Sequence, residues 1–416
     1  MPFTQLGLSP AFLLALQRIG FINPTPIQSA AIPIVLRGDD VVAKAQTGSG
    51  KTLAYGLALL HNLAKSNASQ GRSPRALVLV PTRELAIQVS ESFQRIANQL
   101  PQSLKISVVF GGVSINPQMM AMRGGTDVLI ATPGRLLDLA SRNAVLLSNI
   151  NTLVLDEADR LLDMGFEDEL HSLRTLLPSK RQSLFFSATF PSSVTALSQA
   201  WLVNPTLIEI ATTEEDRPDI DQRAIAVDTG RRTQLLRHLI QTHQWKRTLV
   251  FVATKHAAEI VADKLRKARI YAEPFHGELS QGKRSQVLSD FKASRLKVVV
   301  ATDMASRGLD ISELPVVVNF DLPRSSDDYT HRIGRTGRAG EAGIAVSFVT
   351  AATQAHFHLI QKRHGLQLDL EHVPGFEPTD VAQAPNTGGI KGKRPNKKDK
   401  LRAQMAAAAA LKESQP

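Results

Sequence analysis

Residues 41–52 have the sequence VVAKAQTGSGKT, which indicates the architecture more clearly than any other stretch of the chain. The first four form a short apolar run, which suits a strand buried in a parallel sheet. Gly48 and Gly50 permit the backbone angles that let successive N–H groups surround an anion. A helix-forming run follows Lys51, and a helix N-terminus adds its positive end to such a site. This order predicts a phosphate-binding loop between a strand and a helix.

The side chains of this loop suit phosphate chemistry. Lys51 supplies a positive charge for β- and γ-phosphates, and the hydroxyl of Thr52 suits Mg²⁺. The usual pattern begins with glycine, whereas this loop begins with Ala45, and the rest of the pattern is intact. We therefore expect a nucleotide phosphate site formed by Ala45, Gln46, Thr47, Gly48, Ser49, Gly50, Lys51 and Thr52.

Short apolar runs recur through the first half of the chain, with helical stretches such as Glu84–Leu100 between them. This alternation predicts an α/β domain with a doubly wound parallel sheet. Ligands of such sheets bind at the carboxyl ends of the strands, so the polar residues that follow each run are candidate site residues. The predicted strands are Ala76–Val80, Ile106–Phe110, Asp127–Ala131, Thr152–Leu155 and Ser183–Phe186.

The second half repeats this layout. A polar run with Pro218 separates the halves and is typical of an interdomain linker. We predict a first domain over residues 1–210, a linker over 211–221, a second α/β domain over 222–370 and a flexible tail over 371–416. Strands in the second domain are predicted at Val250–Val252, Glu273–Phe275, Val298–Val300 and Val316–Phe320.

The chain of 416 residues carries a net charge of +11, which favours polyanions such as nucleic acid as partners. A merely basic protein fits the charge equally well. Residues 391–416 hold eight basic and two acidic residues, so this part of the tail carries +6. We interpret the tail as a non-specific phosphate-binding arm, with a role in solubility alone as the alternative.

Several classes of protein are excluded or disfavoured by what the chain lacks. With no cysteine there is no disulfide framework and no thiolate metal site. Residues Met1–Leu8 do not resemble a secretory signal, and no apolar run approaches the roughly 18 residues of a membrane span. We expect a cytoplasmic protein without a membrane partner.

Asp156 and Glu157 follow the predicted strand Thr152–Leu155. A carboxylate at the end of an apolar strand can position Mg²⁺, which suits Asp156, while Glu157 can orient and polarise an attacking water. Taken alone, an acidic cluster is more often a solvated turn or a helix cap. The phosphate loop upstream favours the catalytic interpretation.

A cluster of arginines follows in the second half. Arg332, Arg335 and Arg338 are spaced at i, i+3 and i+6, which predicts one helical face with Gly334 and Gly337 inside the helix. Such charges repel each other unless an anion lies against them, and phosphoryl transfer uses arginine fingers. A solvated basic helix face is the alternative.

In this order, the clusters resemble those of a DEAD-box ATP-dependent RNA helicase over Phe3–Val349, with an opening similar to that of the bacterial RhlE type. The resemblance implies two RecA-like domains that locally separate RNA duplexes with Mg-ATP hydrolysis. It implies catalytic roles for Lys51, Asp156, Glu157, Arg335 and Arg338. It also implies adenine contacts from Phe21 and Gln28, ribose and phosphate contacts from Gly308 and Asp310, and coupling of hydrolysis to strand separation by Ser187, Thr189 and His331.

The RNA contacts that the resemblance implies are residue types suited to phosphates and sugars. Aromatic residues are only 5% of the chain, which favours backbone binding without sequence readout. The first domain would contribute Pro81, Thr82, Arg83, Gly111, Gly112, Thr132, Pro133, Gly134 and Arg135. The second would contribute Thr302 and Asp303, with Thr254 as a further candidate.

The candidate ATP site is divided between two domains, so ATP and RNA would each favour closure and bind cooperatively. Two alternatives remain open: a non-hydrolysing RNA clamp or scaffold, and a DNA-directed helicase. RNA is the expected partner, with ribosomal or decay complexes as candidate settings.

Overall fold

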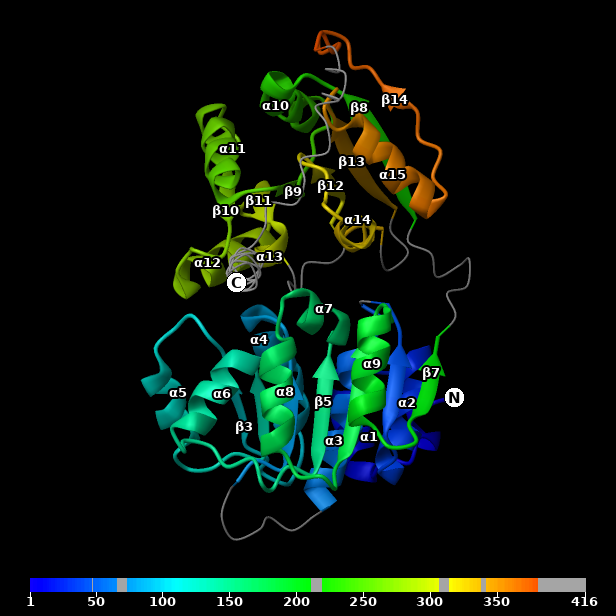
Figure 1. The fold of residues 1–416 in the computed structure, drawn as a ribbon, viewed down its shortest axis with the longest axis vertical. Coiled ribbons are helices and arrows are strands. Elements are labelled where there is room, and N and C mark those ends of the chain that lie inside the picture. The colour runs from blue at the N-terminus through cyan, green and yellow to red at the C-terminus, as the bar shows by residue number, and fades with distance from the viewer. Residues whose placement is uncertain (47, 66–72, 211–218, 307–313, 338–341, 381–416) are drawn as a thin grey trace, which may run out of the picture.

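The computed structural model of the protein describes residues 1–46, 48–65, 73–210, 219–306, 314–337 and 342–380. Two α/β lobes lie one above the other along the long axis of the molecule (Figure 1). Each lobe contains one seven-stranded sheet in which every pair of neighbouring strands is parallel. The predicted fold class is confirmed.

The sheet of the first lobe has the order β3-β4-β2-β5-β6-β1-β7. Its strands are short and almost continuously apolar because both faces are covered by helices. The strands are β1 (Val41–Lys44), β2 (Ala76–Leu79), β3 (Ile106–Val109), β4 (Val128–Ala131), β5 (Thr152–Asp156), β6 (Gln182–Ser187) and β7 (Thr206–Glu209). The first six agree with the predicted strands to within one residue at each end, whereas β7 was not predicted.

Alternate residues of these strands enter two different cores. In β2, Ala76 and Val78 pack into one core, whereas Leu77 and Leu79 pack into the other. The first core lies under α1 (Pro10–Arg18), α2 (Pro26–Arg37), α3 (Lys51–Lys65) and α4 (Arg83–Ala97). The second lies under α5 (Ile115–Met122), α6 (Pro133–Ser141), α7 (Ala158–Asp163), α8 (Glu167–Leu176) and α9 (Ser192–Trp201).

The second lobe repeats the topology with the order β10-β11-β9-β12-β13-β8-β14. Its strands are β8 (Ile220–Ala226), β9 (Thr248–Val252), β10 (Ala272–Phe275), β11 (Val298–Thr302), β12 (Val316–Asn319), β13 (Gly343–Val349) and β14 (Leu370–Glu371). Its helices are α10 (Arg232–Thr242), α11 (Lys255–Lys267), α12 (Gln281–Lys292), α13 (Asp303–Ser306), α14 (Ser326–Ile333) and α15 (Gln354–His364). Counting along the chain, β8 to β14 occupy the positions of β1 to β7.

The second lobe extends to Asp380, ten residues beyond its predicted end. Glu371, at the end of β14, accepts hydrogen bonds from the guanidinium of Arg223. Asp228 accepts hydrogen bonds from the backbone N–H groups of Thr379 and Asp380. Residues 371–380 therefore belong with the sheet, and the predicted tail beyond them lies outside the described residues.

The carboxyl ends of the strands in the first lobe point toward the second lobe, as the arrowhead of β5 below α7 shows (Figure 1). On the opposite side of this interface lie α13 and α14 of the second lobe. The polar residues that follow the strands are thus gathered where the lobes meet. In the described part of the chain, no helix has the length and apolar character to cross a membrane.

Candidate active site

The phosphate loop lies between β1 and α3, as predicted. Lys51 is the first residue of α3, and its Nζ donates a hydrogen bond to the carbonyl of Ala45 at 2.9 Å. Gly48 and Gly50 have φ of +85° and +92°, which side chains disfavour. At Gly50 a Cβ would also lie 2.4 Å from Nε2 of Gln28. The loop therefore requires glycine there for both conformation and space.

Gln28 binds this loop from α2. Its Nε2 donates to the carbonyl of Gly50 at 3.2 Å, and its Oε1 accepts from the backbone N–H of Thr25 at 3.0 Å. The side chain is only 2% exposed. Phe21, the other predicted adenine contact, is half-buried against the first core. The structure thus joins the segment predicted to read adenine directly to the phosphate loop.

Asp156 ends β5 with both carboxylate oxygens bound. Tyr55 of α3 donates its hydroxyl to Oδ2 at 2.7 Å, and the backbone N–H of Glu157 donates to Oδ1 at 2.9 Å. Burial raises the pKa of Asp156 to about 6, against the opposing charge of Lys51. A buried carboxylate of this kind suits a cation.

These groups fit Mg²⁺. The ion prefers oxygen ligands and often takes only one or two carboxylates, with waters and phosphates completing its shell. Asp156 and the hydroxyl of Thr52, at the start of α3, supply such oxygens. Among the described residues no three acidic or histidine side chains gather as a metal cluster.

Glu157 has φ of +51° and ψ of +54°, the left-handed region that costs a residue with a Cβ about 1 kcal/mol. Such outliers gather at functional sites, where the surrounding structure holds them. The carboxylate is buried, and its Oε2 lies 3.2 Å from Nη1 of Arg160. The turn therefore aims a buried carboxylate at the interface rather than into the sheet.

Asp159, two residues further, connects this segment to β6. Its Oδ2 accepts hydrogen bonds from the hydroxyl and the backbone N–H of Thr189, at 2.7 and 3.0 Å. Its own N–H donates to the hydroxyl of Ser187 at 3.2 Å. Although burial raises the pKa of Asp159, these hydrogen bonds hold it below its usual value. These hydrogen bonds connect the end of β5 to Ser187 and Thr189, whose coupling role stays a prediction.

The arginines of the second lobe do not share one helical face, so that prediction is wrong. Helix α14 ends at Ile333 and Gly334 caps it, which leaves Arg335 beyond the helix. Gly337 has φ of +65°, a conformation that no α-helix contains. Arg332 points into its own lobe, where it pairs with Asp303 at 2.6 Å and donates to Asn319.

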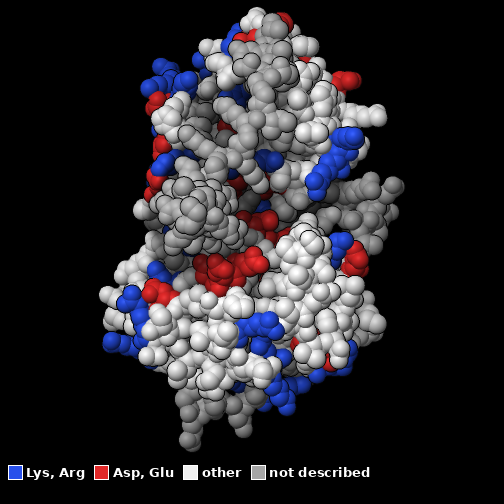
Figure 2. Space-filling model, viewed as in Figure 1, with Lys and Arg blue, Asp and Glu red and all other residues white. Residues whose placement is uncertain are grey.

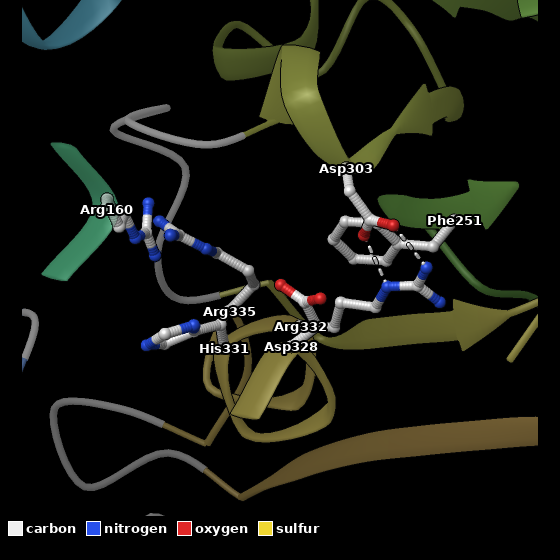
Figure 3. Close-up of a pocket in the computed structure, with 7 residues that line it drawn as sticks. All are labelled: Arg160, Phe251, Asp303, Asp328, His331, Arg332 and Arg335. Atoms are coloured by element: carbon white, nitrogen blue, oxygen red, sulfur yellow. Dashed lines mark hydrogen bonds and ion pairs between the residues drawn. The ribbon is translucent and has the colours of Figure 1, made fainter. Parts of the chain in front are cut away.

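Arg335 instead faces the first lobe. A small cavity at the interface is lined by Arg160, Phe251, Asp303, Asp328, His331, Arg332 and Arg335. Figure 3 shows the guanidinium groups of Arg160 and Arg335 pointing toward one another, with the ring of His331 beside them. Burial, together with the charges of Arg160 and Arg335, lowers the pKa of His331 to about 4, so its ring is neutral at pH 7.

The predicted RNA contacts of the first lobe gather at the ends of β2, β3 and β4, which are neighbours in the sheet. Thr82 caps α4 by accepting the N–H of Leu85, and the hydroxyl of Thr132 accepts the N–H of Gly111. Helices α4 and α6 begin here, and their free N–H groups suit phosphates. The grouped residues are Pro81, Thr82, Arg83, Gly111, Gly112, Thr132, Pro133, Gly134 and Arg135.

In the second lobe, Thr302 ends β11 and Thr254 lies two residues beyond β9, which is its neighbour in the sheet. Thr254 caps α11 by accepting the N–H of Ala257 at 3.1 Å. The carboxylate of Asp303 is bound by Arg332, so it holds the lobe together rather than extending toward a phosphate.

Acidic side chains gather on the first lobe beside the groove between the lobes, at the start of α8 (Figure 2). The first turn of this helix holds Glu167, Asp168 and Glu169. A polyanion is repelled from such a surface. RNA is therefore expected on the side of α4 and α6, where the predicted contacts lie.

Several residues that build the site were not singled out from the sequence. Arg284 of α12 reaches across the interface and donates its Nε to Glu84 of α4 at 2.7 Å, with both side chains buried. No local pattern marks a pair 200 residues apart. Tyr55 and Arg160 carried a weak signal, since they follow Lys51 and Glu157 by about one helical turn. Four predicted site residues lie outside the described residues: Thr47, Gly308, Asp310 and Arg338.

Comparisons with known proteins identify the family. A DEAD/DEAH box helicase model matches residues 25–197, and a helicase conserved C-terminal domain model matches residues 231–340. The chain is 38% identical over 360 residues to the DEAD-box ATP-dependent RNA helicase CshA of Geobacillus kaustophilus, covering 86% of this chain and 76% of the relative. It is also 38% identical over 374 residues to the ATP-dependent RNA helicase DeaD of Buchnera aphidicola subsp. Baizongia pistaciae, covering 90% and 61%. The chain thus spans about three fifths of the length of that helicase.

Solved structures agree with this family. S. cerevisiae Dbp5 bound to RNA and ADP BeF3 is 32% identical, with a TM-score of 0.78 over 89% of this chain and 95% of that one. A DEAD box protein from Methanococcus jannaschii is 34% identical, with a TM-score of 0.50 over 90% and 99%. From the matched models, the relatives and the shared two-lobed fold, we conclude that this chain belongs to the DEAD-box helicase family.

Proposed function

We propose that this chain is an RNA-stimulated ATPase that uses Mg-ATP hydrolysis to separate short RNA duplexes. One observation carries the proposal. Lys51, Asp156 and Glu157 follow strands whose carboxyl ends point toward the second lobe. Arg335 of the second lobe lines a cavity together with Arg160, which pairs with Glu157. A nucleotide between the lobes would therefore meet a complete set of phosphoryl-transfer groups only when the lobes are together.

The side chains support a balanced hydrolysis step. A water oxygen forms a bond to the γ-phosphorus while the bond from that phosphorus to the bridging oxygen breaks, and ADP leaves with the electron pair. Glu157 orients the water and accepts its proton. Lys51 and Arg335 lie against the charge that develops on the phosphoryl oxygens. Mg²⁺ held by Thr52 and Asp156 would supply further neutralisation of the phosphate charge.

RNA would lie along the same carboxyl-terminal edge of each sheet as the nucleotide, but across the other half of its strands. In the first lobe the predicted RNA residues follow β2, β3 and β4, whereas the nucleotide residues follow β1, β5 and β6. Both ligands thus bridge the same two lobes, which makes their binding cooperative by linkage. We propose that closure bends one strand along this edge, and that a regular duplex loses base pairs there because it does not follow the bend.

The two alternative functions are less well supported. The buried and strained Glu157, aimed at the interface, argues against a clamp that never hydrolyses nucleotide. A DNA-directed helicase would need no contact with 2′-hydroxyls, which only RNA offers.

The basic tail would add sequence-independent phosphate contacts, as its charge of +6 favours. A role in ribosomal or decay complexes and a cytoplasmic location stay predictions.

Steady-state ATPase of the full chain tests the proposal. Turnover is measured without nucleic acid and with single-stranded RNA, duplex RNA and single-stranded DNA of equal length. We expect RNA alone to stimulate strongly, and Glu157→Gln to lower kcat about 10²–10⁴-fold while ATP and RNA still bind. Equal stimulation by DNA would favour the DNA-directed alternative. Near-normal turnover of Glu157→Gln would remove that residue from its role.

A further inference from the structure

The outer end of the second lobe, opposite the interface, carries a row of residues at the start of three neighbouring strands. The backbone N–H groups of Lys297 and Val298 both donate to the carbonyl of Tyr271, and the N–H of Thr248 donates to the carbonyl of Lys297. Arg247, Lys297 and Tyr271 therefore lie in one row, directly before β9, β11 and β10. Neighbouring strands are about 4.8 Å apart, so this row spans about 10 Å.

The equivalent positions of the first lobe are neutralised. There, β2, β3 and β4 take the places of β9, β10 and β11, and Arg75 and Asp127 directly precede β2 and β4. Their side chains form a largely buried ion pair at 2.8 Å. In the second lobe Lys297 stands where the first lobe has Asp127, so two cations, Arg247 and Lys297, occupy the positions of an ion pair. This replacement makes the outer edge of the second lobe basic.

Further cations surround the row. Lys246, Lys264 and Arg269 are exposed beside it, in the turn before β9, in the last turn of α11 and in the turn before β10. The nearby carboxylates of Asp263 and Asp290 are paired with other basic side chains, at 2.7 Å each. Figure 2 shows basic side chains gathered at this end of the lobe, over α11. Such a surface attracts polyanions.

Helix ends account for only part of this charge. Basic residues in the last turn of a helix interact favourably with its carbonyl end, which explains Lys264 in α11. Lys246, Arg269 and Lys297 instead lie outside helices, in turns before strands. Arg269 follows the cap of α11 with φ of +61°, a position that favours glycine or asparagine, so a cation is present there at a cost of about 1 kcal/mol.

An aromatic ring adds a second, uncharged feature to this surface. The side chain of Tyr271 is 75% exposed, and its backbone is bonded to that of Lys297. Proteins bind single-stranded nucleic acid by combining basic side chains along the phosphates with aromatic rings on which bases stack. An acidic protein segment would use the cations but not the ring. The combination therefore favours RNA as the partner.

We propose that this outer basic surface, formed by Lys246, Arg247, Lys264, Arg269, Tyr271 and Lys297, binds single-stranded RNA that extends beyond the groove between the lobes. The inference rests on the proposed function only in taking RNA as the ligand. The surface lies on the RNA half of the second lobe, because β9, β10 and β11 are the equivalents of the strands that carry the predicted RNA contacts in the first lobe.

The distance between the groove and this surface sets the length of RNA that reaches both. Helix α11 begins beyond the carboxyl end of β9 and ends before the amino end of β10, so it runs from one edge of the sheet to the other. Its 13 residues span about 20 Å. A strand confined to the groove does not meet the outer basic surface, whereas a strand that continues for about this distance does.

Equilibrium binding of two RNA probes to the full chain tests the proposal. Anisotropy is measured with fluorescent single strands of about 10 and about 30 nucleotides, the shorter being within the site size of a single-strand binding module. Lys264→Gln with Arg269→Gln should lower the affinity for the longer probe about tenfold at low salt and reduce its salt slope by about 1.4, because two phosphate contacts are lost. The affinity for the shorter probe, and the ATPase rate that it stimulates, should stay unchanged.

Two further variants separate stacking from charge and control for net charge. Tyr271→Ala should lower the affinity for the longer probe about fivefold without changing the salt slope, because a stacking contact is lost but no phosphate contact. Lys362→Gln with Arg363→Gln is the matched control, since it removes two exposed cations from the last turn of α15 in the same lobe. It should leave the affinities for both probes unchanged.

Equal affinity of the wild type and of Lys264→Gln with Arg269→Gln for the longer probe would overturn the proposal. An equal loss in the control variant would also overturn it, since net charge alone would then explain the effect. The same loss with the shorter probe would place the two cations in the groove and contradict an outer surface. Failure of RNA to stimulate the ATPase of the wild type would instead overturn the proposed function, so the two failures are distinguishable.

Discussion

The two lobes share one strand order, yet the residues that follow equivalent strands differ in kind. In the first lobe, β1 leads into the phosphate loop and β5 into Asp156 and Glu157. In the second, β8 leads into Asp228, which binds the chain at Thr379 and Asp380, and β12 leads into Asn319 and Asp321. The same scaffold therefore presents the proposed catalytic groups in one lobe and structural contacts in the other.

The carboxylates beyond β5 and β12 show this difference most directly. Asp156 is held by Tyr55 at the mouth of the phosphate site. Asp321, two residues beyond β12, is bound by Arg232 and by the backbone N–H of Ala253. Because the guanidinium of Arg232 already neutralises its carboxylate within the lobe, Asp321 has little capacity left for a cation. The second lobe thus contributes positive charge through Arg335 rather than a second nucleotide site.

The opposite half of the sheet is alike in both lobes. Thr82 after β2 and Thr254 after β9 cap the next helix in the same way, by accepting an N–H three residues later. Both helices begin at the interface edge of their sheets and offer free N–H groups there. The two lobes differ on the nucleotide side and agree on the proposed RNA side, which is the pattern expected if one strand of RNA crosses both.

The largest effect is expected at the cation that the second lobe supplies. Arg335→Ala should lower RNA-stimulated kcat about 10³-fold, because an arginine finger stabilises transition-state charge. RNA affinity without nucleotide should change little. Stopped-flow or steady-state ATPase checks the first point and RNA anisotropy the second. Arg363→Ala, on the exposed end of α15, is the matched control.

If Arg335→Ala turned over ATP normally, the division of catalytic groups between the lobes would be wrong. An equal loss of RNA affinity without nucleotide would point instead to a role in placing the lobes. Either result would contradict the proposal that the first lobe binds the nucleotide and the second lobe completes the nucleotide site.

The buried pair Glu84–Arg284 should have the next largest effect, because it joins the lobes directly. Removing one partner leaves a buried charge without compensation. We expect Glu84→Gln to reduce the gain in RNA affinity that a non-hydrolysable ATP analogue produces by about tenfold. Glu91→Gln, exposed on the same helix, should leave that gain unchanged.

RNA anisotropy with and without the analogue measures this gain. Glu84→Gln is the sharper variant, because Arg284 also donates to the carbonyls of His276 and Ala305 within its own lobe. A gain equal to that of the wild type would show that the pair is a passive contact between the lobes.

How much of this organisation the sequence predicts depends on how local each feature is. The strands and the phosphate loop were predicted because buried apolar runs and the glycines at 48 and 50 are local signals. The different positions of Arg332 and Arg335 were not predicted, because they depend on the residue at which α14 ends. Gly334 carried that information, since glycine often follows the last residue of a helix. The pair Glu84–Arg284 depends on the approach of two lobes, which no local pattern encodes.

A smaller effect is expected from a comparison of two buried tyrosines, one in each lobe. Tyr55 donates a hydrogen bond to Asp156 of the predicted phosphate site, whereas Tyr329 donates one to Gln222 at 3.0 Å. Gln222 is not among the residues of that site. Tyr55→Phe removes a hydrogen bond to a charged acceptor, so we expect about fivefold more Mg²⁺ to be needed for half-maximal binding of a fluorescent ADP. Tyr329→Phe should lose about 1 kcal/mol of stability without changing the Mg²⁺ midpoint. Equal midpoints in both variants would show that Tyr55 only packs.

The smallest effect concerns pH, where the lobes act in opposite directions. The pKa of His331 is lowered to about 4 from about 6.5, so its contribution to stability is present above pH 6.5 and is lost as pH falls toward 4. The pKa of Asp156 is raised to about 6, so stability is gained as pH falls from 6 toward 3.8. The two pH ranges overlap and the two contributions have opposite signs. Their sum should therefore change the free energy of unfolding of the wild type by less than about 1 kcal/mol.

Urea unfolding without Mg²⁺ or nucleotide, at pH 7 and pH 4.5, separates the two contributions. His331→Gln removes the loss, so the protein should gain stability on acidification relative to the wild type. Asp156→Asn removes the gain, so the protein should lose more. If the two variants moved in the same direction, buried charge at the interface would not be divided between the lobes as the geometry of β5 and α14 indicates.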